Sequence, residues 1–156
     1  SYGLKTRLIK KILPNSRFLI VTRNPYIACL KTVQKGQYQH MTKNKDKSVD
    51  LAAQHYSNCM KTMLDEADNA VIVRFEDILN NPFKEIQRIC EELDIPFDPK
   101  MLPQKNDHFY QGKWYPIEKG RNSKWLEKIT AKEIKIINQR CKDICKKLHY
   151  EVLSEN

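Results

Sequence analysis

Two short apolar runs, each enclosed by helical patterns, most strongly constrain the fold of this chain. Residues 17–22 read Arg-Phe-Leu-Ile-Val-Thr and residues 70–75 read Ala-Val-Ile-Val-Arg-Phe. Continuous apolar strands that alternate with helices are typical of a parallel sheet covered on both faces. The sequence therefore predicts an α/β fold in which a parallel sheet is flanked by helices, and its length is most simply that of one domain over residues 1–156.

Periodic apolar positions predict the helices around these strands. The expected helices cover residues 4–12, 25–36, 48–67, 82–93 and 131–149, with a turn or short helix at 76–79. Ser48 is expected to cap the third helix, and Thr130 with Glu133 forms a capping box before the last. Residues 37–47 and 97–122 have no periodicity and are expected to be irregular, and the second is too long for an ordinary connection.

The excess of basic residues predicts an anionic partner. Lys and Arg outnumber Asp and Glu by 28 to 19, which gives a net charge of +9. Such a chain favours association with anions, and nucleic acid, acidic lipid, sulfated sugar and nucleotide all fit. With only four glycines, the sequence contains no Gly-rich loop of the GxxxxGK[ST] kind that cradles phosphates.

Cysteine spacing and hydropathy indicate a soluble chain without a metal site. The five cysteines form no Cys-x-x-Cys pair, and no histidine stands at ligand spacing, so we expect them to be reduced and buried. Reduced cysteines suit the cytoplasm. No apolar run reaches the roughly 18 residues of a membrane helix, and the N-terminus has no signal-peptide pattern. These features predict a cytoplasmic protein with no membrane segment.

The candidate binding site is Arg23-Asn24-Pro25, which follows the first apolar run directly. Pro at the first helical position costs no hydrogen-bond donor, and the backbone N–H groups of a new helix favour an anion. The second strand ends at Arg74-Phe75, and ligands of such sheets gather at the carboxyl ends of the strands. The pattern therefore predicts a phosphate site at Arg23, and its alternative is an arginine that merely faces solvent.

Three ordered segments and the chain's closing residues resemble the sulfotransferases that use 3′-phosphoadenosine 5′-phosphosulfate (PAPS). They read LKTRLIKKILPNSRFLIVTRNP, VIVRFEDILNNPFKEIQRICEELDIPFDP, SKWLEKITAKEI and KLHYE. The resemblance implies a P-loop-kinase-like α/β fold whose N-terminal strand-loop-helix is absent, so that the chain is the C-terminal portion of a sulfotransferase domain. It also implies transfer of a sulfuryl group from PAPS to a hydroxyl or amine, with 3′-phosphoadenosine 5′-phosphate (PAP) as the product.

The resemblance assigns site residues by position. Arg23 matches the arginine of the family that binds the 3′-phosphate of the donor. The serine that the family has eight residues later is replaced here by Lys31, with Thr32 beside it. Lys35 and Lys124 are similar to basic positions of the tyrosyl-protein branch. These five side chains are therefore expected to contact the donor.

The resemblance implies two further donor contacts, but it matches no catalytic residue to a position of this chain. Phe75 stands where the family has a tyrosine near the adenosine, and Arg121 resembles the C-terminal basic segment that closes over the 3′-phosphate. The catalytic residues are expected upstream of Ser1, so this chain alone should show little or no transferase activity. No metal is expected, and the acceptor is a small molecule, a carbohydrate or a peptide.

Two alternatives to this interpretation remain at the level of sequence. The first alternative is a noncatalytic module that binds a nucleotide or a sulfated glycan. The second is a basic nucleic-acid-binding domain. Within the first interpretation, the missing half of the donor site belongs to the N-terminal part of the same enzyme, from which the chain has been truncated, or to a separate polypeptide. We expect truncation, because the similarity begins abruptly in mid-pattern at Leu4-Lys5-Thr6.

Overall fold

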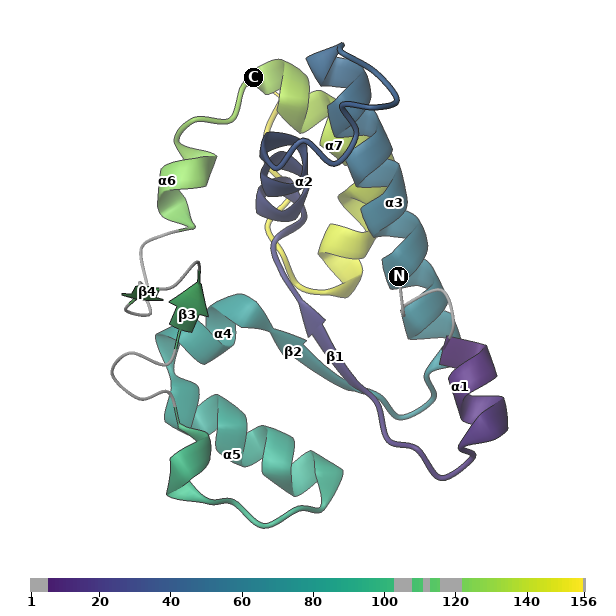
Figure 1. The fold of residues 1–156 in the computed structure, drawn as a ribbon, viewed down its shortest axis with the longest axis vertical. Coiled ribbons are helices and arrows are strands. Elements are labelled where there is room, and N and C mark those ends of the chain that lie inside the picture. The colour runs from purple at the N-terminus through teal and green to yellow at the C-terminus, as the bar shows by residue number, and fades with distance from the viewer. Residues whose placement is uncertain (1–5, 103–107, 111–112, 116–121, 156) are drawn as a thin grey trace. The chain divides into compact units, whose positions relative to one another are not determined.

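The computed structural model describes residues 6–102, 108–110, 113–115 and 122–155, and of residues 108–110 and 113–115 it describes the backbone alone (Figure 1). Two compact units divide the chain. The first, called the helical unit, comprises residues 1–16, 23–68 and 122–156. The second, called the strand unit, comprises residues 17–22 and 69–121.

Long helices form the helical unit. Its elements are α1 (Thr6–Ile12), α2 (Pro25–Gln34), α3 (Lys45–Glu66), α6 (Ser123–Leu126) and α7 (Ala131–Lys147). Helix α3 packs against α7 and α2, and Figure 1 shows these three lying together. The side chains buried among them include Tyr26, Ile27, Cys29, Val49, Ala53, Ile137, Cys141 and Cys145. All five cysteines are buried and carry free thiols, as the sequence predicts.

Helix α2 starts where the sequence places it, because local capping specifies the start. Pro25 occupies the first helical position, and the side chain of Asn24 accepts hydrogen bonds from the backbone N–H groups of Tyr26 and Ile27, at 3.1 and 3.4 Å. These bonds satisfy backbone donors that a helix otherwise leaves without a partner. The expected transition from strand to Pro-started helix is confirmed.

The start of α3 corrects one prediction. Asn44, and not Ser48, is the N-cap, because its side chain accepts a bond from the N–H of Lys47 at 3.0 Å. Ser48 lies inside the first turn, where its hydroxyl donates to the carbonyl oxygen of Asn44 at 3.1 Å. The expected irregular segment is therefore shorter, since its last three residues are already helical.

The capping box before α7 is confirmed. The N–H of Glu133 donates to the Thr130 hydroxyl at 3.2 Å, and the N–H of Thr130 donates to the Glu133 carboxylate at 2.9 Å. The same carboxylate accepts a salt bridge from Lys45 at 2.7 Å, at the first residue of α3. Glu133 is buried, so this cap also ties the starts of two long helices together.

A buried hydrogen-bond network fixes the first turn of α2 against α7. The Tyr26 hydroxyl donates to the side-chain oxygen of Asn138 and accepts from the backbone N–H of Leu153 at 3.0 Å. The amide of Asn138 in turn donates to the carbonyl oxygen of Leu153 at 3.1 Å. Burial raises the pKa of Tyr26 to about 12, so its hydroxyl keeps the proton that it donates.

The strand unit contains the parallel pair that the sequence predicts. Its elements are β1 (Leu19–Thr22), β2 (Val71–Arg74), α4 (Phe75–Asn80), α5 (Pro82–Leu93), η2 (Pro99–Met101), β3 (His108–Tyr110) and β4 (Lys113–Tyr115). Strands β1 and β2 pair in parallel, with Leu19 opposite Val71 and Thr22 opposite Arg74. This register brings the carboxyl ends of both strands to the same edge of the sheet.

Burial of the two strands differs from the prediction. Ile20, Val71 and Val73 are buried, whereas Leu19 is 45% and Val21 52% exposed. Val71 and Val73 pack against Ile89 of α5, so this helix covers one face of the pair. Among the described residues of this unit, the strands are therefore buried on one face and not on both, because continuous apolar sequence reports hydrophobicity and not what covers it.

Residues 97–122, expected to be irregular, contain regular structure. A 3₁₀ turn, η2, is followed by β3 and β4, which pair antiparallel with Phe109 opposite Trp114. Strands of three residues are too short to show a readable alternation of polar and apolar residues. Within the part of the chain that the structure describes, no helix has the length and apolarity needed to cross a membrane.

Candidate functional site

Arg23 occupies the junction between β1 and α2. Its backbone carbonyl accepts a hydrogen bond from the Tyr56 hydroxyl of α3 at 2.7 Å. One terminal nitrogen of its guanidinium, Nη2, donates to the side-chain oxygen of Asn122. The residue is thus held at its backbone by one element of the helical unit and at its side chain by another. Its predicted role in binding phosphate remains a prediction.

The backbone at this junction differs from the expected anion site. Pro25 has no N–H group, the N–H groups of Tyr26 and Ile27 donate to the Asn24 side chain, and that of Ala28 donates to the Asn24 carbonyl oxygen at 2.9 Å. The first donors of α2 are therefore already satisfied within the chain. An anion at this place would depend on side chains, and on Arg23 first.

The Tyr56 hydroxyl keeps the proton that it donates to the Arg23 carbonyl oxygen. Burial raises the pKa of the Tyr56 phenol, and the nearby Tyr150 adds to the shift. The phenol therefore stays protonated at neutral pH and keeps its bond to the Arg23 carbonyl oxygen. Tyr56 lies on α3, which places the bond on one of the best-packed elements of the unit.

Helix α6 contacts two of the predicted cations. Asn122, the N-cap residue of α6, is only 9% exposed and accepts from Arg23. Its backbone oxygen accepts from the N–H groups of Trp125 and Leu126 at 3.1 and 3.4 Å. The ammonium group of Lys31 on α2 lies 5.7 Å from the centre of the Trp125 ring, within the range of a cation–π interaction.

The other predicted donor residues on α2 and α6 bond within their own helix or face solvent. The hydroxyl of Thr32 donates to the carbonyl oxygen of Ala28 at 2.8 Å. Lys35, the C-cap residue of α2, and Lys124 in α6 have exposed side chains. The helical unit thus brings Arg23 and Lys31 to one short helix, and it leaves the two remaining lysines in solvent.

One predicted donor contact, Phe75, lies in the strand unit. Phe75 is the first residue of α4, directly after β2, and its side chain is half-buried. Arg121 lies outside the described residues. The roles of Phe75 and Arg121 toward a donor stay predictions.

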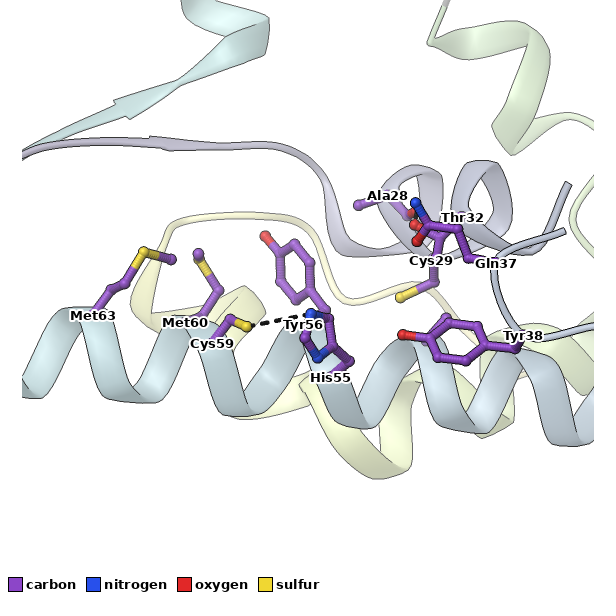
Figure 2. Close-up of a pocket in the computed structure, with 11 residues that line it drawn as sticks. Ala28, Cys29, Thr32, Gln37, Tyr38, His55, Tyr56, Cys59, Met60 and Met63 are labelled. Carbon is purple, nitrogen blue, oxygen red and sulfur yellow. Dashed lines mark hydrogen bonds between the residues drawn. The ribbon is translucent and has the colours of Figure 1, made fainter. Parts of the chain in front are cut away.

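A cavity of about 250 Å³ lies between α2 and α3 (Figure 2). Its lining residues are Ala28, Cys29, Thr32, Gln37, Tyr38, Ala52, His55, Tyr56, Cys59, Met60 and Met63. One polar contact within it joins the Cys59 sulfur to the His55 ring at 3.6 Å. A hydrogen bond with Cys141, together with burial, raises the pKa of the Cys29 thiol, so this thiol stays protonated at neutral pH.

Sequence reasoning missed three residues that contact Arg23 or Lys31, namely Tyr56, Asn122 and Trp125. Tyr56 stands in the middle of an amphipathic helix, and nothing in its pattern separates it from a core tyrosine. Trp125 directly follows the predicted Lys124 and Asn122 precedes it by two positions, and this closeness to the lysine was the available signal. Among the described residues, no group of three or more His, Cys, Asp or Glu side chains is placed to hold a metal ion.

Comparison with known proteins identifies one family. The model of the sulfotransferase family matches residues 1–99 of the chain. No curated protein matches the chain.

Two solved structures share the fold. The sulfotransferase domain from the curacin biosynthetic pathway is 15% identical, with a TM-score of 0.67, and the match covers 97% of this chain and 61% of that one. The sulfotransferase domain from the Synechococcus PCC 7002 olefin synthase is 20% identical, with a TM-score of 0.59, over 89% of this chain and 55% of that one. The chain therefore spans less than two thirds of either domain. The predicted α/β fold is confirmed, and it corresponds to part of such a domain.

Proposed function

Because the chain belongs to the sulfotransferase family, we propose that it carries the 3′-phosphate half of a PAPS-binding site, with Arg23 as the anchoring residue. The observation that supports the proposal is the place of Arg23. It directly follows β1, it precedes a Pro-started helix, and it is held from two sides by Tyr56 and Asn122.

Arginine suits this role chemically. Its planar guanidinium presents a fixed fork of N–H donors that matches two oxygens of a phosphate. Lysine binds the same group as a point charge. Lys31 would then add charge where the family has a serine hydroxyl, and Lys35 and Lys124 would add weaker, solvent-screened attraction.

The proposed reaction is transfer of the sulfuryl group from PAPS to a hydroxyl or amine of a small molecule, a carbohydrate or a peptide. The acceptor oxygen or nitrogen attacks sulfur and gives up its proton to a base, the bond from sulfur to the bridging phosphate oxygen breaks, and PAP leaves. The described residues supply the grip on the donor, which positions its sulfur for attack. We propose that the residues acting on the sulfuryl group itself precede Ser1, so that these 156 residues alone turn over little or no donor.

Calorimetric titration with PAP tests the proposal. The Arg23→Ala variant loses a charge-assisted contact worth about 1.5–3 kcal/mol, so its affinity for PAP should fall by about 10- to 150-fold. Arg140→Ala is the matched control, because Arg140 pairs with Asp50 at 2.8 Å on the exposed surface of α7. Its affinity for PAP should stay within about twofold of the wild type.

Two outcomes would contradict the assignment. An Arg23→Ala variant that melts like the wild type and binds PAP equally well would remove Arg23 from the site. Absence of PAP binding by the wild-type chain would remove the 3′-phosphate site itself.

The net charge of +9 supports a second candidate, a nucleic-acid-binding domain. Affinity that comes from many phosphate contacts falls steeply with salt and tolerates the loss of one arginine. Binding of a short oligonucleotide that weakens steeply with salt and is unchanged by Arg23→Ala would favour this candidate. A noncatalytic nucleotide-binding module, in contrast, would bind PAP as proposed and show no turnover in any longer form of the protein.

A further inference from the structure

We propose that Asn122 is a positioning residue for Arg23, and that helix α6 couples Arg23 to Lys31 through Asn122 and Trp125. The inference rests on the proposed function, because it states how the 3′-phosphate contacts are oriented. It assigns a role to α6, whose four residues lie about 90 to 100 positions after the two cations in sequence.

The contact between Asn122 and Arg23 is suited to orienting a guanidinium. Asn122 is 9% exposed, and its backbone is fixed by the two bonds that start α6, so its side-chain oxygen is presented from a rigid place. A guanidinium has five N–H groups in one plane, so a bond at Nη2 sets the orientation of that plane and is compatible with a bidentate phosphate contact. The carboxamide is neutral, so it orients Arg23 without cancelling its charge.

The contact between Trp125 and Lys31 likewise orients a cation, here the Lys31 ammonium group. A lysine side chain has four rotatable carbon bonds, and the ring restricts it by attracting its ammonium group from 5.7 Å. Trp125 and Asn122 are three residues apart and belong to one hydrogen-bonded turn. The orientation of both cations therefore depends on α6 being formed.

In the opposite interpretation Asn122 competes with the anion, and the change in phosphate affinity on removing Asn122 then has the opposite sign. If Asn122 merely occupied the place of a phosphate oxygen, its removal would strengthen binding. If Asn122 orients Arg23, its removal weakens binding of the phosphate that Arg23 contacts. The two interpretations are therefore distinguished by the direction of one change in affinity.

The experiment compares PAP with adenosine 5′-monophosphate, which lacks the 3′-phosphate. The ratio of the two affinities, measured by calorimetry, isolates the contribution of that phosphate. Asn122→Ala should lower the ratio by about 3- to 10-fold, less than the loss of Arg23 itself, because Asn122 acts on the phosphate only through the guanidinium. It should leave the affinity for adenosine 5′-monophosphate unchanged. Asn58→Ala is the control, because Asn58 is exposed on α3 of the same unit, and its ratio should equal that of the wild type.

A second variant keeps the test valid if Asn122→Ala folds poorly. Asn122→Asp has the same shape and places a carboxylate against Arg23, so it should lower the ratio more than Asn122→Ala at low salt. The difference should shrink as salt screens the new charge. In an Arg23→Ala background, neither substitution should change the ratio further, because Asn122 acts through Arg23.

The outcomes separate this inference from the proposed function. A wild-type chain that binds both nucleotides equally overturns the proposed function, and the inference with it. A wild-type chain that prefers PAP, together with an Asn122→Ala variant whose ratio is equal or higher, overturns the inference alone. A folded Asn122→Asp variant with the wild-type ratio at low salt has the same meaning.

Discussion

Removing the Tyr26 hydroxyl should destabilise the protein more than a change of one oxygen atom suggests. Tyr26 is fully buried in the first turn of α2, and its hydroxyl joins Asn138 of α7 to the backbone of Leu153. Phenylalanine fits the same space, so Tyr26→Phe creates no cavity. The substitution therefore isolates the cost of breaking a buried polar network.

The magnitude follows from the two groups that lose their partner. Asn138 is 7% exposed, so its side-chain oxygen cannot exchange the Tyr26 bond for water, whereas Leu153 is half-buried and its N–H can reach solvent more easily. Leaving a buried polar group without a bond costs about 1–3 kcal/mol. We expect the full cost at Asn138 and a fraction at Leu153, about 2 kcal/mol in all. For a chain of this length, that loss lowers Tm by about 4–8 °C.

Urea unfolding followed by circular dichroism measures the loss directly. Tyr38→Phe is the matched control, because it removes the same atom from a half-buried tyrosine at the cavity, and it should cost less than about 0.5 kcal/mol. Adding Asn138→Ala to Tyr26→Phe should cost less than the sum of the two single changes, because the residues share one network.

The reasoning would be refuted by a Tyr26→Phe variant whose free energy of unfolding lies within about 0.5 kcal/mol of the wild type, at an unchanged m-value. Strict additivity of the Tyr26 and Asn138 substitutions would likewise show that the two side chains do not form one network.

Three further predictions concern the cap of α7 and the backbone of Arg23. Thr130→Ala should lower the free energy of unfolding by about 1 kcal/mol, and Thr130→Ser by much less, in urea titrations. Burial alone would raise the pKa of Glu133, but hydrogen bonds from Lys45 and Thr130 outweigh it and lower that pKa below its usual 4.5. The stability that Glu133 contributes is therefore present above pH 4.5 and is lost as the pH falls through the lowered pKa. Below pH 4.5 the wild type should lose more stability than Glu133→Gln, which lacks the carboxylate. An equal loss in the two proteins would contradict the assignment. Tyr56→Phe, which removes the donor to the Arg23 carbonyl oxygen, should weaken PAP binding by about 2- to 10-fold in calorimetry, and an unchanged affinity would show that this bond does not position Arg23.

Short-range signals predicted much of this fold correctly. The start of α2 at Pro25 and the capping box of Thr130 and Glu133 depend on residues close together in sequence. The parallel pairing of β1 and β2 joins distant residues, and it was predicted from the order of apolar strands and helices along the chain. Ser48 failed as a predicted cap because Asn44 offered an equivalent oxygen four residues earlier, and pattern alone does not rank two such residues. The hairpin of β3 and β4 was missed because its strands are shorter than one readable period.

In the candidate site, too, local sequence signals were readable and contacts between distant segments were not. Arg23 was accessible to sequence reasoning because a strand, an arginine and a Pro-started helix are consecutive. Its partners were not, because Tyr56 and Asn122 lie 33 and 99 positions away along the chain. The predicted backbone anion site at α2 was also incomplete, since only the structure shows that Asn24 uses the first N–H groups of the helix.

The sequence by itself determined the positions of β1, β2 and the long helices, the starts of α2, α5 and α7, and that an arginine follows the first strand. These properties depend on periodicity and capping, which act over a few residues. Only the tertiary structure decided which face of each strand is buried, and that α3 and α6 are the elements that hold Arg23. Contacts of that kind form between distant segments, because packing brings together side chains whose separation in sequence carries no local signal.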